Sequence, residues 1–265
     1  MADFLGLKNV HVFVTGASGG VGLATSRAFL DQGAFVTLHY NSNSATLDPL
    51  LHEFPDRAFA VQARITDESS VSQAFESAIS KFGPVQVLIV NHGIWPTQPL
   101  LVKDMSLEHW NNTINVNLTG SFLAIRHFMQ QLEKHNVQDN VAVVMVGSTA
   151  GKFGEWYHAD YSASKSAMMY GLTLSLKNEI VQICPKGRVN SVAPGWIRTA
   201  MAEPALKDQD VVKKAFATSP LNKISEPQDI ANAILYLASE KASGNITGHV
   251  MDVNAGMEGR IINPL

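Results

Sequence analysis

The sequence predicts an α/β fold built on a doubly wound parallel sheet. Short apolar runs rich in β-branched residues alternate with longer amphipathic segments along most of the 265 residues. Almost all of the short runs are continuously apolar, and such strands are typical of parallel sheets because helices bury both of their faces. The sequence contains no internal repeat, low-complexity tract or linker, so we expect residues 1–265 to form a single domain.

Seven short segments have the length and the apolar character of buried strands. Each is bounded by glycine, proline or polar residues that favour turns. The predicted strands are 10–14, 34–40, 57–63, 85–90, 141–146, 188–193 and 249–253.

Apolar residues at helical spacing predict helices between these strands. The predicted helices are 21–30, 66–82, 106–133, 159–176 and a last one ending at residue 238. Ser225 and Gln228 have the spacing of a capping box that opens the last helix. Residues 200–221 are polar, with helical propensity and no core pattern, and we expect a mobile substrate loop at about 196–222.

The composition argues against several classes of partner. Hydrophobic residues make up 46% of the chain, charged residues make up 16%, and the formal net charge is −3. No cluster of lysine and arginine favours nucleic acid. The single cysteine, Cys184, excludes an internal disulfide and a cysteine-based metal site, and we expect no metal. No segment resembles a signal peptide or a membrane span, so we expect a cytoplasmic protein without a membrane partner.

A glycine-rich turn follows the first predicted strand and precedes the first predicted helix. Gly16, Gly20 and Gly22 lie in this turn at a spacing that differs from G-x-G-x-x-G. Glycines let the backbone approach a pyrophosphate, and the helix that follows presents free N–H groups. Glycines also end strands for steric reasons alone. The context of strand, turn and helix favours nucleotide binding over that steric explanation.

The second predicted strand ends at the position that faces the adenosine ribose in dinucleotide folds. An acidic residue there would bind the 2′-hydroxyl of NAD. This chain has Tyr40, Asn41 and Ser42 instead, with no acidic residue before Asp48. A 2′-phosphate would therefore meet hydroxyls and amides rather than a carboxylate, although an ordinary polar loop explains the same residues equally well.

Tyr161 and Lys165 are four residues apart in a predicted helix, so their side chains share one face. A nearby cation favours the phenolate and lowers a tyrosine pKa from about 10. Such a tyrosine can exchange a proton with a carbonyl or an alcohol. The same spacing also describes an exposed Tyr–Lys pair without a role. Ser148 follows the fifth predicted strand, where it is either a hydrogen-bond partner for substrate or an ordinary turn residue.

Taken together, these motifs resemble the classical short-chain dehydrogenase/reductase family over nearly the full length. The resemblance implies a Rossmann-type fold with a seven-stranded parallel sheet and helices on both faces. It also implies dimers or tetramers formed through two long helices and the C-terminal strand. The residues that carry it are the turn at 15–22, Asn91, Gly93, Asn117, Ser148, Tyr161, Lys165, the run 190–195 and the run 246–248.

The resemblance also implies the catalytic roles. Tyr161 would be the general acid in reduction and the general base in oxidation. Lys165 would lower the pKa of Tyr161 and hold the nicotinamide ribose. Ser148 would position the carbonyl oxygen, and Asn117 would anchor a water in a proton relay.

The predicted cofactor-binding residues come from this resemblance and from the loop after the second predicted strand. The phosphates would face the glycine turn, the adenosine would face the ends of the second to fourth strands, and the nicotinamide would lie beside residues 194–199. The set is Gly16, Ser18, Gly20, Val21, Gly22, Tyr40, Asn41, Ser42, Arg64, Ile65, Asn91, Gly93, Tyr161, Lys165, Pro194, Gly195, Ile197 and Thr199.

Three positions depart from the family pattern. Arg64 stands where an aspartate near the adenine is common, and it would either meet adenine or a 2′-phosphate, or be a surface arginine. His92 would add bulk and a charge near the cofactor. Asn254-Ala255-Gly256 stands where the family has a pair of glycines, and we expect this difference to affect packing rather than chemistry. Arg64 makes NADP the expected cofactor, with NAD as the alternative.

Six residues in the loops after the fourth, fifth and sixth predicted strands are expected to form the walls of the substrate pocket. Their apolar character indicates an apolar or aromatic ketone or secondary alcohol as substrate. Anchoring of loops to the core explains these side chains equally well, and Lys152 and Arg198 leave a phosphorylated substrate open. The six are Trp95, Phe153, Trp156, Tyr157, Trp196 and Met201.

The function expected from the sequence is that of an NADPH-preferring carbonyl reductase or alcohol dehydrogenase. Three alternatives remain: an NAD-dependent secondary-alcohol dehydrogenase, a relative that performs elimination or epimerisation, and a redox-inactive nucleotide sensor. The last two conflict with the joint presence of Ser148, Tyr161 and Lys165.

Overall fold

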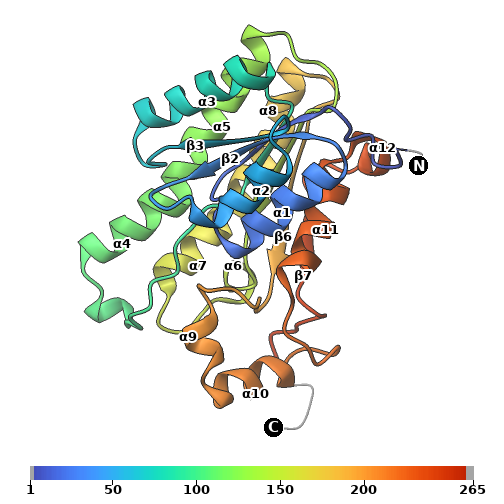
Figure 1. Ribbon diagram of the computed structural model, residues 1–265. Coiled ribbons are helices and arrows are strands. Elements are labelled where there is room, and N and C mark those ends of the chain that lie inside the picture. The colour runs from blue at the N-terminus through green and yellow to red at the C-terminus, as the bar shows by residue number, and fades with distance from the viewer. Residues whose placement is uncertain (1–2, 261–265) are drawn as a thin grey trace.

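The computed structural model describes residues 3–260, and its centre is one parallel sheet of seven strands (Figure 1). The strand order is β3-β2-β1-β4-β5-β6-β7, so the chain runs outward from β1 to one edge and then from β4 to the other. All seven predicted strands are confirmed. They are β1 (His11–Val14), β2 (Phe35–Tyr40), β3 (Ala58–Gln62), β4 (Val87–Val90), β5 (Ala142–Val146), β6 (Arg188–Pro194) and β7 (Val250–Val253).

Helices cover both faces of this sheet, as the resemblance implied (Figure 1). α1 (Gly20–Asp31), α2 (Asp48–Glu53) and α11 (Pro227–Ala238) pack on one face. α3 (Glu68–Phe82), α5 (Gly120–Lys134) and α8 (Thr173–Ile183) pack on the other. The remaining helices are α4 (Leu107–Ile114), α6 (Ala150–Phe153), α7 (Ala159–Ser166), α9 (Glu203–Leu206), α10 (Gln209–Ala217) and α12 (Glu240–Ser243).

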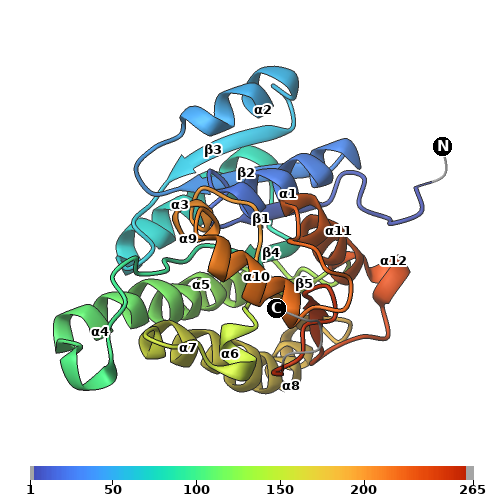
Figure 2. The ribbon, with the colours of Figure 1, turned by 90° about the horizontal axis from the view of Figure 1, so that it is seen from below.

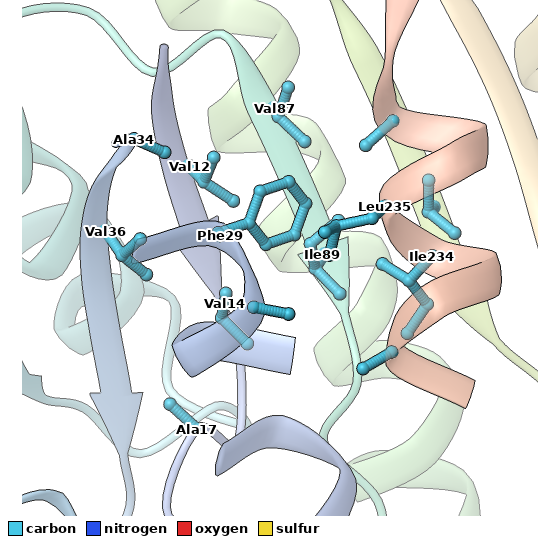
Figure 3. Packing of buried hydrophobic residues seen from close by; sticks show 14 of the residues in the cluster. Val12, Val14, Ala17, Phe29, Ala34, Val36, Val87, Ile89, Ile234 and Leu235 are labelled. Atoms are coloured by element: carbon cyan, nitrogen blue, oxygen red, sulfur yellow. The ribbon is translucent and has the colours of Figure 1, made fainter. Parts of the chain in front are cut away.

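Strand alternation divides the core between these two faces. Val12 and Val14 of β1 point to the α1/α11 side, whereas Phe13 between them points to the α3/α5 side. Figure 3 shows Phe29 of α1 between the β1 valines and Leu235 of α11, and the Phe29 side chain is fully buried. This packing fixes α1, and with it the glycine turn that opens α1.

The two long predicted helices exist, and each contains a π-helical segment. Residues 106–133 were predicted as one helix and consist of α4, a π-helical segment (Asn115–Thr119) and α5. The helix that begins at 159 continues as α7, a second π-helical segment (Ala167–Leu172) and α8, and it ends at Ile183 rather than at 176. π-Helical segments are often found at functional sites.

The predicted capping box of the last long helix was wrong by one residue. α11 begins at Pro227, and the backbone amide of Glu226 donates to Oδ2 of Asp229 at 2.8 Å. Glu226 and Asp229 therefore take the places that were assigned to Ser225 and Gln228. Ser225 instead bonds through its backbone to Trp196 and Arg198, so it links two loops.

Three short helices, α2, α6 and α12, had no counterpart in the sequence-based prediction. A helix of one or two turns has too few core positions to show a periodic pattern. The polar segment 200–221 forms α9 and α10, which lie below the sheet in Figure 1 and in front of the strands in Figure 2. No helix within residues 3–260 is both long and apolar enough to cross a membrane.

Candidate active site

A cleft of about 580 Å³ runs along the carboxyl ends of the strands. This volume is typical of ligand pockets, and the position is where ligands bind in open α/β sheets. Most residues predicted to bind the cofactor or to act in catalysis line the cleft. They are Gly16, Ser18, Gly20, Val21, Gly22, Asn41, Arg64, Ile65, Asn91, Gly93, Ser148, Tyr161, Lys165, Pro194, Gly195, Ile197 and Thr199.

Three predicted site residues lie behind or beside the cleft surface. Tyr40 is half-buried and packs against the core, because it ends strand β2. Ser42 is exposed beyond the rim. Asn117 is fully buried behind the cleft wall. His39, Thr66 and Val116 also line the cleft, and no sequence motif marked them as cofactor contacts.

The glycine turn is built around close backbone contacts. A Cβ on Gly22 would lie 2.2 Å from the Gly16 carbonyl oxygen and 2.7 Å from Asn91 Nδ2, so no larger residue fits there. Gly16 has φ of +64°, a conformation that glycine adopts without strain. α1 begins at Gly20 with no side-chain cap, so its first N–H groups can face a phosphate. These features fit a dinucleotide pyrophosphate.

Asn91 holds the turn from the neighbouring strand. Its Nδ2 donates to the carbonyl oxygens of Thr15 and Gly16, both at 3.0 Å. Its backbone amide donates to Thr15 Oγ1 at 2.9 Å. Asn91 therefore shapes the phosphate loop from below, in addition to lining the cleft beside the predicted adenosine ribose.

Two buried histidines complete this support, and both are held neutral. His39 Nδ1 accepts from the Gly16 amide at 3.0 Å, and His92 Nε2 donates to the Val116 carbonyl at 3.1 Å. Burial lowers the pKa of His39 to about 4 and that of His92 to about 3. His92 was expected to bring a charge near the cofactor; that expectation was wrong, because an apolar environment disfavours the imidazolium.

Arg64 and Asn41 form the rim at the adenosine end of the cleft. Both are exposed, and the Arg64 backbone amide donates to Ser70 Oγ at 3.0 Å. Arg64 therefore adds an exposed cation to this end of the cleft, and its contact with a 2′-phosphate stays a prediction.

Lys165 and Tyr161 meet inside the cleft from α7. Lys165 is 4% exposed, so this is no surface pair. Lys165 Nζ donates to the Val146 carbonyl at 2.8 Å and lies 5.8 Å from the centroid of the Tyr161 ring. The hydroxyl of Ser148 forms a hydrogen bond with Tyr161. Three residues from two different segments thus converge at one point.

Burial controls the protonation of this group. It raises the pKa of Tyr161 to about 12, against the opposing effect of the Ser148 hydrogen bond and with a smaller raising effect of the Glu155 charge. Burial also lowers the pKa of Lys165 to about 8. The expected lowering of the tyrosine pKa was wrong for this chain, because the loss of hydration on burial outweighs the lowering effect of the Ser148 hydrogen bond. Near neutrality Tyr161 carries its proton, as a proton donor must.

Asn117 lies in the π-helical segment and anchors the loop after β4. Its Oδ1 accepts from the Ile94 amide at 2.8 Å, and its Nδ2 donates to the Ile94 carbonyl at 3.0 Å and to Ser164 Oγ at 3.1 Å. Gly93 separates Asn117 from Lys165: a Cβ there would lie 3.2 Å from Asn117 Oδ1 and 3.4 Å from Lys165 Nζ. The water relay through Asn117 stays a prediction.

Asp160, directly before Tyr161, ties α7 to α4. Its side chain is fully buried, accepts a hydrogen bond of 2.5 Å from Thr113 Oγ1 and lies 3.4 Å from His109 Nε2. This link fixes the helix that carries Tyr161 and Lys165. Among residues 3–260, no group of three or more histidine, cysteine or acidic side chains is arranged to hold a metal ion.

A smaller hollow of about 120 Å³ adjoins Ser148 and Tyr161 on the substrate side. Trp95, Trp196 and Met201 line it as expected, and the two indole rings meet edge to face at a centroid distance of 6.3 Å. The assignment of the other three aromatic residues was wrong. Phe153, Trp156 and Tyr157 do not line the hollow and are exposed, Trp156 by 86%.

Glu155 was missed by the sequence analysis and lines the same hollow. It lies between α6 and α7, and no spacing rule marks it. Burial raises the pKa of its carboxyl group. Lys152 and Arg198, which left a phosphorylated substrate open, form ion pairs with Asp252 and Glu226 instead.

Comparison with known proteins gives one consistent family. A family model described as enoyl-(acyl carrier protein) reductase matches residues 16–258. A 3-oxoacyl-(acyl-carrier-protein) reductase from Synechocystis is 34% identical over 248 residues, which cover 92% of this chain and 95% of that protein. The 3-oxoacyl-(acyl-carrier-protein) reductase FabG of Thermotoga maritima is 32% identical, with coverage of 95% of this chain and 98% of that protein.

Solved structures agree with this family and with the sheet described above. A short-chain dehydrogenase/reductase from Brucella melitensis, titled glucose/ribitol dehydrogenase, has a TM-score of 0.84 at 28% identity and covers 94% of this chain and 96% of its own. The structure titled gox2181 has a TM-score of 0.88 at 25% identity, with coverage of 96% and 97%.

Proposed function

Because the chain belongs to the classical short-chain dehydrogenase/reductase family, we propose that it is an NADPH-preferring carbonyl reductase. The observation that carries the proposal is the meeting of Ser148, Tyr161 and Lys165 beside a cleft whose other end is a glycine turn. The family relation supports oxidoreductase chemistry, and the residues of this chain support the direction and the cofactor.

The cleft would hold NADPH along its full length. The glycine turn and the start of α1 would bind the phosphates, Arg64 and Asn41 would face the 2′-phosphate, and Pro194 and Gly195 would border the nicotinamide. When bound, the cofactor supplies the hydride that reduces the carbonyl carbon.

Tyr161 would donate the proton that completes the alcohol. Its pKa of about 12 keeps the hydroxyl protonated near neutrality, and Ser148 would share the carbonyl oxygen as a second hydrogen-bond donor. The Lys165 ammonium would stabilise the phenolate formed as the proton leaves, since it lies in the same water-poor site. Donation by a neutral tyrosine favours reduction over oxidation.

Three alternatives remain. The relatives are named 3-oxoacyl-(acyl-carrier-protein) reductases, so a 3-oxoacyl thioester is the second candidate for the ketone. An NAD-dependent secondary-alcohol dehydrogenase would require Arg64 to have no role. A redox-inactive sensor agrees poorly with an assembled Ser148, Tyr161 and Lys165.

We propose a homodimer or homotetramer that works in the cytoplasm. Phe122 is 49% exposed on α5, beside a hollow formed with Leu118 and with Leu172 of the neighbouring helix. An exposed apolar patch on two long helices is typical of a contact between subunits. Light scattering should give a dimer or tetramer for the wild type and a smaller species for Phe122→Glu; a monomeric wild type would contradict this.

A paired titration with NADPH and NADH, followed by NADPH consumption with a panel of aromatic ketones and a 3-oxoacyl thioester, tests the proposed activity. Tighter NADPH binding with ketone turnover supports it. Turnover of the thioester alone would favour the second candidate. A preference for NADH would remove Arg64 from the account, and binding of neither nucleotide would contradict the function of the glycine turn.

A further inference from the structure

The substrate hollow contains one ionisable group that the reduction itself does not need. Glu155 lines the hollow together with Ser148, Tyr161, Trp95 and Trp196. Its charge also raises the pKa of Tyr161, so the carboxylate acts on the proton donor across the hollow. Ser148 and Tyr161 suffice to bind and protonate a carbonyl oxygen, so Glu155 requires a separate explanation.

The carboxylate of Glu155 has no cationic partner among residues 3–260. Lys152 and Arg198, the two cations that the sequence placed in the substrate loops, are paired elsewhere: Lys152 Nζ lies 2.5 Å from Asp252, and Arg198 Nε lies 3.1 Å from Glu226. Burial alone accounts for the raised pKa of Glu155, with no hydrogen bond or opposite charge to offset it. A half-buried carboxylate without a partner is destabilising, and a bound cation would relieve that penalty.

The walls around this carboxylate suit the same kind of ligand. Trp95 and Trp196 meet edge to face at 6.3 Å, and both border the hollow. The Trp95 ring packs against His158 at a centroid distance of 4.5 Å, so the two indoles serve as apolar walls. The carboxylate of Glu155 is the group that would bind an ammonium group, through a charge-assisted hydrogen bond. An anionic group in this hollow would be repelled by Glu155 and would find no free cation on Lys152 or Arg198.

We propose that the physiological substrate is a ketone carrying an ammonium group that binds Glu155, with Trp95 and Trp196 beside it. The inference rests on the proposed reductase function and names its substrate class. Tyr161 and Ser148 would hold the carbonyl oxygen, and Glu155 would hold the cation at the opposite end of the substrate, which fixes its orientation. Glu155 is in this account a specificity-determining residue.

A pair of isosteric ketones tests the proposal directly. At about pH 7, para-(dimethylaminomethyl)acetophenone is a cation, whereas para-isobutylacetophenone has the same shape without charge. The wild type should give a higher kcat/KM with the cationic ketone. Glu155→Gln should lower the cationic-to-neutral ratio by about tenfold, the equivalent of 1.4 kcal/mol, and leave the neutral ketone within about threefold. An unchanged ratio, or an equal loss for both ketones, would overturn the proposal.

A matched control separates the local carboxylate from overall charge. Glu76 is an exposed residue of α3 outside the nucleotide cleft and the substrate hollow, and Glu76→Gln removes the same charge. This variant should keep the wild-type ratio. A fall of the ratio in Glu76→Gln equal to that in Glu155→Gln would mean that net charge, and not the hollow, sets the preference.

A binding measurement makes the inference independent of turnover. Calorimetry of the NADPH-loaded protein with benzyldimethylammonium should show binding to the wild type that is about tenfold tighter than to Glu155→Gln. Equal binding, or no binding to the wild type, would overturn the inference even where neutral ketones are reduced. Binding without turnover of any ketone would contradict the reductase function and leave the cation site standing.

Discussion

The two halves of the cleft are built by different means. The nucleotide half is held by the backbone: Gly22 touches Gly16, and Asn91, His39 and His92 hydrogen-bond to the chain around the turn. The substrate half is formed by side chains, chiefly Trp95, Trp196 and Glu155, from loops after the strands. The side chains of Asn91, His39 and His92 have hydrogen-bond partners within the chain, whereas the Glu155 carboxylate has none among the described residues.

This difference shows how one fold can bind a shared cofactor and a particular substrate. Backbone contacts tolerate few substitutions, so the nucleotide half depends on particular glycines. Side chains on loops can be exchanged without disturbing the sheet, so the substrate half can vary. We therefore expect substitutions in the two halves to separate cofactor affinity from substrate selectivity.

Gly22→Ala should have the largest effect, because the added Cβ would lie 2.2 Å from the Gly16 carbonyl oxygen. The turn must then open, and NADPH affinity should fall about 100-fold or more. Titration by nucleotide fluorescence measures this loss. Gly171→Ala is the matched control, since a Cβ on Gly171 meets nothing within 4 Å. A Gly22→Ala variant that binds NADPH as tightly as the wild type would refute the claim that close backbone contacts shape the nucleotide half of the cleft.

His92 should make the stability of the nucleotide half sensitive to acid. Its pKa is about 3 in the folded chain and about 6.5 when unfolded, so the unfolded state binds more protons between these values. Its contribution to stability is complete above about pH 6.5 and is lost as the pH falls toward 3, by about 1.4 kcal/mol per pH unit.

Urea unfolding of the wild type and His92→Asn at several pH values between 5 and 7.5 tests this dependence. Near pH 5 the slope of unfolding free energy against pH should be about 1.4 kcal/mol per unit smaller in the variant, and above about pH 7 the two slopes should converge. The slope is the informative quantity, because lost hydrogen bonds to Thr15 and Val116 lower stability at every pH. Equal slopes would show that His92 is not held neutral.

Arg64→Ala should change cofactor preference at the rim of the same half. Arg64 lines the cleft and is exposed, so a bound 2′-phosphate would lose one charge-assisted contact. NADPH affinity should fall about tenfold and NADH affinity should change little. Equal losses for the two nucleotides would leave Arg64 as a surface arginine without a role in specificity.

Trp95→Leu should act on the substrate half alone and have the smallest effect. Trp95 lines the smaller hollow but not the nucleotide cleft. The KM for an aromatic ketone should rise about threefold to tenfold, as for a lost aromatic contact, with unchanged NADPH affinity. A change in NADPH affinity of similar size would show that the two halves are not separable.

The fold could be predicted from the sequence because its signals are strong and local. The seven apolar runs and the long amphipathic helices each repeat a pattern over enough residues to be recognised. The short helices α2, α6 and α12 were not predicted, because each buries only one residue and so shows no periodic pattern. At the start of α11, Ser225 and Gln228 fit the sequence pattern of a capping box, but Glu226 and Asp229, which no such pattern marks, form it in the structure.

The candidate site could be predicted where spacing sets the geometry. Tyr161 and Lys165 share a helix face, and the glycine turn follows a strand, so both lie in the cleft. Residue spacing does not fix the direction of side chains in loops, and the side chains of Phe153, Trp156 and Tyr157 are exposed instead of lining the hollow. The pKa of Tyr161 also differed from expectation, because its value depends on burial that a sequence does not report. Glu155 was not predicted as a site residue for the same reason, because the sequence does not show that its carboxyl group is half-buried.

The most direct test of the proposed mechanism is single-turnover reduction of an aromatic ketone by Tyr161→Phe loaded with NADPH. The variant keeps the ring and loses only the proton donor. The account predicts NADPH affinity within about twofold of the wild type and hydride transfer slowed by about 100-fold or more. Near-normal hydride transfer in this variant would contradict the assignment of Tyr161 as the proton donor.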